Sequence, residues 1–144
     1  LGLSERLSYN LSGGLFFNQH NMYFADFSYF AKRYFPEPWG DRFGGIFYNL
    51  GGDWCNASDK YIQGHLMYES PFILLRFLKP NPKAHKYLVS ERFYLSQLWT
   101  PVLPNYSELG YGIGSDLFHI ALFLGFEKFK YQSVGLKFAL ELFR

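Results

Sequence analysis

Cysteine, charged side chains and long apolar runs are all scarce in this sequence. Its single cysteine, Cys55, excludes an internal disulfide and a cysteine-rich metal site, and we expect it to stand in a turn without a chemical role. No apolar stretch approaches the ~18 residues that a spanning helix needs. The longest, from Ile120 to Phe126, is interrupted by Gly125. The chain would therefore have to enter a membrane through strands.

Charge of either sign is also low. Charged residues make up 18% of the chain, below the ~25% of typical soluble domains. The formal net charge of +2 is too small to indicate a nucleic-acid partner, and no basic stripe runs along any predicted element. We therefore expect no nucleic acid among the partners.

Aromatic residues are abundant instead. They make up 22% of the chain, with 17 Phe and 12 Tyr, while the mean hydropathy is only -0.11. A transmembrane β-barrel needs aromatic girdles and an apolar band on its outside, yet its polar interior keeps the mean hydropathy near zero. The length of 144 residues also allows one soluble domain with its own core. Composition thus favours the barrel without excluding a soluble fold.

The clearest strand pattern lies at residues 131–143. Tyr131, Ser133, Lys137 and Glu141 share one parity and form a polar face. The other parity is apolar and carries Val134, Leu136, Phe138, Leu140 and Leu142, with Phe143 as a terminal aromatic residue. A strand of ~9–11 residues with one apolar face is typical of a transmembrane β-strand. We predict the closing strand of an outer-membrane β-barrel.

The same strand carries a second prediction. Its apolar residues from Leu136 to Phe143 match the kind of C-terminal signal that the barrel assembly machinery binds by pairing with an open strand edge. The alternative is that the alternation serves lipid contact only. Both roles are compatible with one strand.

Alternation predicts seven further strands. They lie at residues 1–17, 22–30, 43–50, 61–69, 87–99, 106–113 and 119–126, separated by short turns or proline-containing loops. Adjacent strands joined in this way form an antiparallel up-and-down meander. The predicted fold is therefore all-β, with about eight transmembrane strands in one domain that spans residues 1–144. Because the chain opens inside a strand, we expect the C-terminal portion of a larger barrel, with a complete eight-stranded barrel as the alternative.

Two segments depart from this pattern. From Phe72 to Lys83 an apolar cluster with Arg76 is followed by prolines, which predicts a short helix at the periplasmic membrane interface, or a buried helix if the protein is soluble. In the strand at 87–99, Glu91 and Gln97 fall among apolar residues of the same parity. A β-bulge in that strand would restore the alternation.

The order of the strands also sorts their connections into two groups. If the C-terminus is periplasmic, the connections at 72–86 and 114–118 lie on the periplasmic side. The connections around residues 18, 53, 101 and 128 then face the outside.

Polar residues opposite the apolar sets are the candidate site residues. They are Gln63, His65, Glu69, Arg92, Glu108, Lys137 and Glu141, which we expect to face the barrel lumen as a hydrogen-bonded network. His65 and Glu69 share a strand face, and Arg92 is expected to face them from the next strand. A His–carboxylate pair for binding or hydrolysis is the sharper alternative, but no motif supplies the third group that a serine hydrolase needs. We predict no enzymatic activity, no cofactor and no metal site.

Several stretches occur in an order that resembles a known family. They are residues 22–27 (MYFADF), 58–61 (SDKY) followed by His65, 72–79, 108–113 (ELGYGI) and 134–143. Together they resemble the C-terminal barrel of an uncharacterised Bacteroidota outer-membrane family whose members begin with a carboxypeptidase-regulatory-like domain. The resemblance covers nearly the whole chain. It implies a signal peptide, a small β-sandwich domain and earlier strands ahead of this chain, and it assigns no catalytic residues.

The sequence therefore predicts an integral protein of the bacterial outer membrane with a structural, binding or transport role. Its expected partners are the lipid bilayer, the barrel assembly machinery and a larger outer-membrane complex. A soluble β-barrel or sandwich that binds an apolar ligand is the alternative, and a membrane hydrolase that uses His65 comes last. The membrane protein and the soluble protein differ in which face of the strands is exposed. A soluble barrel turns its apolar face inward, whereas a membrane barrel turns it outward to the lipid.

Overall fold

A computed structural model describes residues 5–17, 28–29, 47–50, 55–56, 60–70, 74, 90–115 and 118–140. These residues form one six-stranded antiparallel sheet in the order β1-β4-β5-β6-β7-β8. The strands are β1 (Arg6–Leu15), β4 (Lys60–Ser70), β5 (Ser90–Trp99), β6 (Tyr106–Gly114), β7 (Phe118–Glu127) and β8 (Lys130–Leu140). Two residues each of β2 (Ser28–Tyr29) and β3 (Cys55–Asn56) pair separately.

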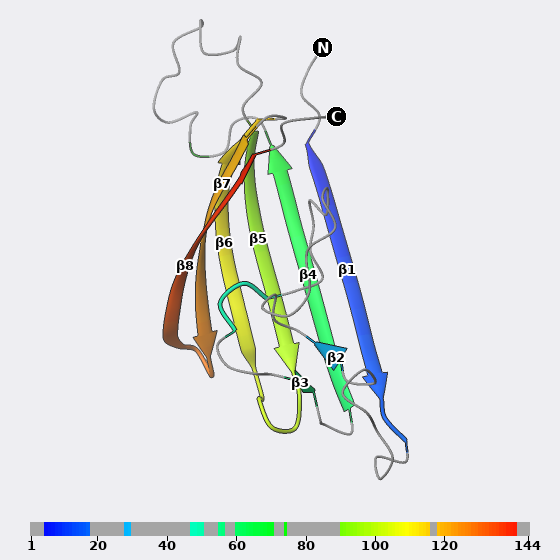
Figure 1. Ribbon diagram of the computed structural model, residues 1–144. Coiled ribbons are helices and arrows are strands. Elements are labelled where there is room, and N and C mark those ends of the chain that lie inside the picture. Colours follow the sequence, from blue (N-terminus) through cyan, green and yellow to red (C-terminus); the bar gives the residue numbers. More distant parts are fainter. Residues whose placement is uncertain are drawn as a thin grey trace, which may run out of the picture.

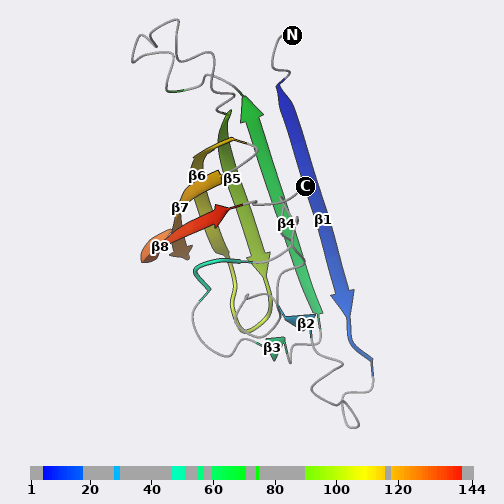
Figure 2. The same cartoon turned by 45° about the horizontal axis from the view of Figure 1, so that its top comes forward.

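From β4 to β8 the sheet is an up-and-down meander, because each strand pairs with the next one along the chain. The predicted all-β antiparallel architecture is confirmed at this level. Figures 1 and 2 show that the sheet is flat at β1 and curls strongly towards β8. The sheet is not closed, since β1 and β8 form its two edges within the described part of the chain.

The meander differs from the prediction between β1 and β4. These two strands pair directly, from Arg6 opposite Glu69 to Leu15 opposite Lys60, so no strand lies between them. Of the strand predicted at 22–30, the described residues Ser28–Tyr29 pair with Cys55–Asn56, outside the main sheet. The short Cys55 strand also corrects the expectation that this cysteine stands in a turn.

The strand predicted at 43–50 is likewise absent over its described residues. Phe47–Leu50 form a bridge and a bend, and we call them the inner segment. Its contacts are with side chains on one face of the sheet instead of with a strand edge. The buried apolar residues of the segment are Phe47 and Leu50, three positions apart, and not the alternating residues that predicted a strand.

The two connections that the structure describes in full, the turns at 100–105 and 128–129, lie at the same end of the sheet, where β5 and β7 end and β6 and β8 begin. Lys128 and Phe129 both have positive φ, as a two-residue hairpin turn requires. In the turn at 100–105, Thr100 accepts a hydrogen bond from the Leu103 N–H through Oγ1 at 2.9 Å.

Strand β5 contains no bulge. It pairs in unbroken register with both β4 and β6 over its whole length. Glu91 therefore shares a face with Phe93, although it is fully buried. Its carboxylate accepts hydrogen bonds from the Leu74 N–H, at 3.2 and 3.0 Å, and from the Tyr111 hydroxyl. The predicted repair by a bulge is wrong, because the chain after β4 returns to cover this carboxylate.

A bulge occurs instead between β7 and β8. Gly125 pairs with Ser133, but Phe126 pairs with Tyr131, so the register passes over Gln132. The extra residue shifts the parity of the strand. Tyr131 and Ser133, which share a parity in the sequence, thus lie on opposite faces of the sheet.

The predicted interfacial helix, from Phe72 to Lys83, lies outside the described residues apart from Leu74, which is a bend. The end of the closing strand, residues 141–144, also lies outside them. No helix within the described ranges is long and apolar enough to cross a membrane.

The arrangement at Glu91 makes the first prediction. Glu91→Ala removes the acceptor of the Leu74 N–H, and a hydrogen bond to a charged acceptor contributes roughly 1.5–3 kcal/mol. Amide hydrogen exchange in peptides that contain Leu74 should therefore become at least about tenfold faster. Gln97→Ala, on the same face of β5 near its other end, is the matched control and should leave that exchange unchanged. Equal exchange in the Glu91 variant and the wild type would contradict the anchoring role.

Candidate functional site

The two faces of the sheet differ sharply in chemistry. One face, which we call the outer face, carries nearly all of the large exposed apolar side chains of the strands. They are Leu7, Tyr9, Leu11, Leu15, Ile62, Leu66, Leu95, Leu109, Phe118, Ile120, Leu122, Tyr131, Val134, Leu136 and Phe138. The opposite, inner face carries the polar side chains and is covered in part by the inner segment.

The outer face is ordered in rows that run across the strands. Its middle row is aliphatic from β4 to β8 and consists of Leu66, Leu95, Leu109, Leu124 and Val134. The next row towards one end of the sheet is aromatic over β4, β5 and β6, with Tyr68, Phe93 and Tyr111. Trp99 and the pair Phe126–Tyr131 lie towards the other end. An aliphatic band is thus flanked by aromatic side chains on both sides.

The inner face has a charged row at one end. Glu69 lies directly opposite Arg92 in the register, and the Arg92 guanidinium contacts Glu69 Oε1 through Nε and Nη2, both at 3.0 Å. The Ser90 hydroxyl donates to the same carboxylate oxygen at 2.8 Å. The predicted approach of Arg92 to Glu69 is therefore present, and the carboxylate is held by a cation and a hydroxyl.

A second polar row crosses the middle of the inner face. His65, Ser96 and Glu108 follow one another on β4, β5 and β6, and His65 Nδ1 lies 2.8 Å from Ser96 Oγ. The ring of Phe47 packs on His65 with a centroid distance of 4.9 Å. In a hydrolytic triad the histidine stands between the nucleophile and the carboxylate, whereas here the serine stands in the middle. His65 and Ser96 form a hydrogen-bonded pair beneath Phe47, and Glu108 has donors of its own.

Glu108 is the centre of the inner face. Its carboxylate is almost completely buried, and it accepts hydrogen bonds from the backbone N–H groups of Tyr48 (2.9 Å) and Asn49 (2.7 Å) and from the Tyr106 hydroxyl (2.8 Å). A buried carboxylate requires such donors, because removing it from water without them is costly. Glu108 therefore fixes the inner segment to β6.

The inner segment also reaches β7 and β8. Asn49 donates from Nδ2 to the Phe123 carbonyl at 2.7 Å, and its own carbonyl accepts from the Ser133 hydroxyl at 3.3 Å. A side chain at Gly135 would place its Cβ 2.0 Å from Asn49 Oδ1, so glycine is needed there. Lys137 donates to the Tyr48 hydroxyl at 3.0 Å and lies 4.4 Å above the Tyr48 ring. The segment is thus held against three consecutive strands.

Apolar packing covers the end of the inner face near the 100–105 turn. A buried cluster there is formed by Phe47, Leu50, Leu98, Leu103 and Tyr106, with Tyr61 packed against it. Phe47 belongs to the inner segment, so the cluster and the Glu108 hydrogen bonds hold the same segment in place. Both interactions bury this end of the inner face.

Six of the seven sequence-predicted site residues lie on the inner face: Gln63, His65, Glu69, Arg92, Glu108 and Lys137. They form four groups. Glu69 binds Arg92, His65 binds Ser96, and Gln63 donates from Nε2 to the Ser12 hydroxyl at 2.8 Å. Glu108 and Lys137 both bind Tyr48 of the inner segment. The seventh, Glu141, lies outside the described residues.

Sequence reasoning missed the partners of these residues. Ser12, Ser90 and Ser96 are ordinary small residues in the sequence, and only the strand register places them beside Gln63, Glu69 and His65. His119, which lies 3.3 Å from the Tyr94 hydroxyl through Nε2, was missed for the same reason. All of them lie at inner-face positions of their strands, so a search of those positions for polar side chains would have identified them.

The predicted assembly-signal strand is described in part. Leu136 and Phe138 lie on the outer face and are exposed. Leu140 closes β8, while Leu142 and Phe143 lie outside the described residues. Within the described ranges, no group of three or more His, Cys, Asp or Glu side chains is arranged to hold a metal ion.

Residues 1–113 match the C-terminal domain of a family of unknown function, DUF5686. The chain belongs to this family. The predicted resemblance to an uncharacterised family is thereby confirmed for the DUF5686 domain, while its bacterial group and the domain ahead of it stay predictions. Searches of the curated proteins and of the solved structures gave no match to the chain.

The role of Glu108 makes the second prediction. Glu108→Gln keeps the side-chain volume but replaces one acceptor oxygen by an NH₂ group, which faces backbone N–H donors. The change should lower the free energy of unfolding by about 1–3 kcal/mol, measured by urea denaturation. Glu127→Gln, at the end of β7 near the 128–129 turn, is the matched control and should leave the urea midpoint unchanged. Equal midpoints for both variants would contradict a central role of Glu108.

Proposed function

We propose that this DUF5686 domain is the C-terminal portion of a transmembrane β-barrel in the bacterial outer membrane, with a structural, binding or transport role and no enzymatic activity. The observation that carries the proposal is the inversion of the two faces. Between Lys60 and Glu91 near its two ends, the exposed outer face is predominantly apolar. The covered inner face holds the Glu69–Arg92 ion pair and Glu108. In water this arrangement would expose an apolar patch much larger than soluble monomers tolerate.

The rows on the outer face support the same environment. Transmembrane barrels present an apolar band flanked by aromatic girdles at the two interfaces. The aliphatic row of Leu66, Leu95 and Leu109 with aromatic side chains towards both ends has this order. The soluble alternative requires the apolar stripe on the covered face, so the observed distribution favours the membrane.

Strand length is also suited to a bilayer. Strand β4 has 11 residues and β5 has 10. Eleven residues at about 3.3 Å each extend roughly 36 Å, and a tilt near 40° reduces the height to roughly 28 Å. This height is close to the roughly 30 Å of the hydrocarbon core.

The open sheet supports a portion of a larger barrel. The smallest transmembrane barrels have about eight strands, and the described sheet has six with β1 and β8 as its edges. Closure would need further strands between these edges. In the closed form, the inner face with Glu69, Arg92 and Lys137 would line the lumen, and the inner segment would lie within it.

The third prediction tests the membrane environment. Leu109 is 46% exposed in the middle row of the outer face. A lysine at the bilayer midplane costs about 2–4 kcal/mol, whereas a surface substitution in water usually changes stability by less than about 0.5 kcal/mol. Leu109→Lys should therefore lower the unfolding free energy of the lipid-reconstituted protein by about 2–4 kcal/mol.

The matched control is Val102→Lys, in the turn at 100–105. Val102 is 66% exposed but lies beyond the ends of the strands. The cost of a charge falls to about 0–1 kcal/mol near the interfaces, so this variant should be nearly neutral. If Leu109→Lys were equally neutral, the outer face would be in water and the proposal would fail.

The fourth prediction concerns the assembly machinery as a partner. Leu142→Asp introduces a charge at one of the alternating apolar positions of the predicted closing strand. The assembly machinery would recognise these side chains when it pairs with the strand. We expect a severalfold lower yield of folded protein, measured as the band that shifts between cold and boiled SDS gels. The amount exported to the cell envelope should stay the same. Leu142→Ile keeps the apolar side chain and should assemble normally, and normal assembly of Leu142→Asp would rule out the signal.

A further inference from the structure

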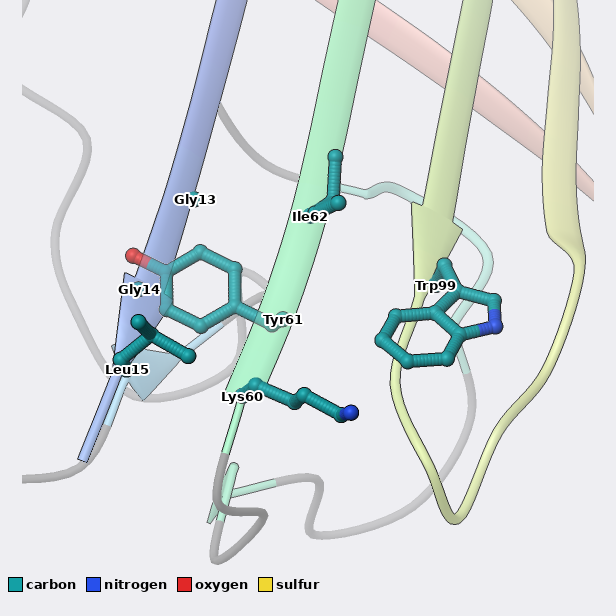
Figure 3. A pocket seen from close by; sticks show the side chains of 7 residues that line it. All are labelled: Gly13, Gly14, Leu15, Lys60, Tyr61, Ile62 and Trp99. Carbon is teal, nitrogen blue, oxygen red and sulfur yellow. The ribbon is translucent and has the colours of Figure 1, made fainter. Parts of the chain in front are cut away.

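A groove lies on the outer face where β1 and β5 end and β4 begins. It has a volume of about 420 Å³ and is lined by Gly13, Gly14, Leu15, Lys60, Tyr61, Ile62 and Trp99. Figure 3 shows Lys60 and Trp99 side by side at its rim, with Ile62 above them and the two glycines on the neighbouring strand. The lining is almost entirely apolar, with one cation at its end.

The groove exists because β1 lacks a side chain at one outer-face position, Gly13. Gly13 lies opposite Ile62 on the outer face, in the parity that carries Leu11 and Leu15 on either side of it. An apolar side chain at Gly13 would continue the apolar face, and its absence leaves a gap of the kind that an acyl chain fills. The gap is bounded by Leu15, Ile62 and Trp99.

Gly14 and Tyr61 lie behind the groove, because both have the inner-face parity of their strands. A Cβ at Gly14 would lie 2.3 Å from the Tyr61 ring, so only glycine allows this ring to lie across β1. The ring also packs towards Phe16, with a centroid distance of 6.1 Å. The floor of the groove is therefore the backbone of β1 and β4, with the Tyr61 ring packed on its inner side.

The polar end of the groove is cationic. Lys60 is exposed, and its ammonium group lies 5.6 Å from the centre of the Trp99 ring. The seven lining residues include this one cation and no carboxylate. The apolar stem of lysine suits burial along an apolar wall, while its charge stays at the water side. An anion is the ligand that this end attracts.

The position of the groove along the strands matches the edge of the apolar band. The row of Gly13, Ile62 and Trp99 lies two rows beyond the aliphatic row of Leu66 and Leu95. If the outer face contacts lipid, as proposed above, this row lies where acyl chains meet headgroups, the usual depth of tryptophan and lysine anchors.

We infer that this groove binds a lipid with an anionic, phosphate-bearing headgroup. One acyl chain lies over Gly13 between Leu15 and Ile62, and the phosphate contacts the Lys60 ammonium beside Trp99. The inference rests on the proposed membrane location, and it adds a lipid-selective site to an otherwise uniform lipid-facing surface.

The test measures lipid selectivity on the complete protein in mild detergent. The protein is exposed to equal amounts of phosphatidylglycerol and phosphatidylcholine with identical acyl chains, and the retained lipids are counted by native mass spectrometry. A lysine near the membrane surface changes the affinity for an anionic lipid about fivefold. We expect wild-type protein to retain phosphatidylglycerol preferentially, and Lys60→Met to lower that preference about fivefold.

Two controls separate the groove from general surface charge. Lys130→Met removes an exposed cation at the same end of the sheet on β8 and should leave the preference unchanged. Gly13→Leu fills the groove and should lower retention of both lipids. Gly64→Leu, on the outer face where a Cβ would have ordinary contacts, should not. Because a Cβ at Gly13 would lie 3.1 Å from the Tyr61 carbonyl oxygen, the exposed Lys60 substitution is the decisive one if Gly13→Leu fails to fold.

The outcomes are distinguishable from those of the proposed function. Equal preference in wild type and Lys60→Met, or an equal loss in Lys130→Met, would overturn the lipid site while leaving the Leu109 result intact. Displacement of the lipid by inorganic phosphate alone would also overturn it, since the acyl chain would then contribute nothing. A neutral Leu109→Lys would instead refute the membrane location itself.

Discussion

The carboxylate of Glu108 is the interaction on which the inner face depends. It is almost completely buried, and the donors that make its burial affordable are two backbone N–H groups of the inner segment and the hydroxyl of Tyr106. Its donors in the inner segment are backbone N–H groups. Glu108 therefore fixes the backbone path of the segment, whichever side chains the segment carries. The segment in turn brings Phe47 over His65 and Asn49 over β7 and β8. One charge thereby organises contacts with four strands.

The outer face follows from the same sheet by the geometry of the strand. Successive side chains point to opposite faces, so each residue that serves the inner network alternates with one that must suit the outer surroundings. Leu109 stands between Glu108 and Gly110 in just this way. Exposing the apolar outer face to water would cost free energy, and a bilayer as the solvent removes this cost. The same bilayer would contact the aromatic side chains on either side of the aliphatic row. The polar interior and the apolar exterior are then two consequences of one alternation.

The charged exceptions to the alternation lie near the ends of the strands. Glu91 lies on the outer face but is covered by the chain at Leu74, and Lys60 lies on the outer face beside Trp99. A charge is tolerated in these positions because each lies near water or has hydrogen-bond donors of its own. Between these ends the described strands carry no charged side chain on the outer face, and the polar residues there are Gln97 and Ser107. The positions of the exceptions therefore mark the edges of the apolar band.

The sequence by itself determined which residues alternate, and hence the strands β1 and β4 to β8 and the common face of Gln63, His65, Glu69, Arg92, Glu108 and Lys137. It did not determine which strands pair. Backbone hydrogen bonds are alike along every strand, so nothing in residues 1–17 specified β4 as the partner or excluded residues 43–50 from the sheet. Three features were visible only in the tertiary structure. Phe47–Leu50 pack on the inner face, and a bulge at Gln132 places Tyr131 on the outer face. Glu91 is buried and accepts a hydrogen bond from Leu74. Periodicity is a local property of the chain, whereas pairing, bulges and covering segments depend on contacts between residues that are distant in sequence.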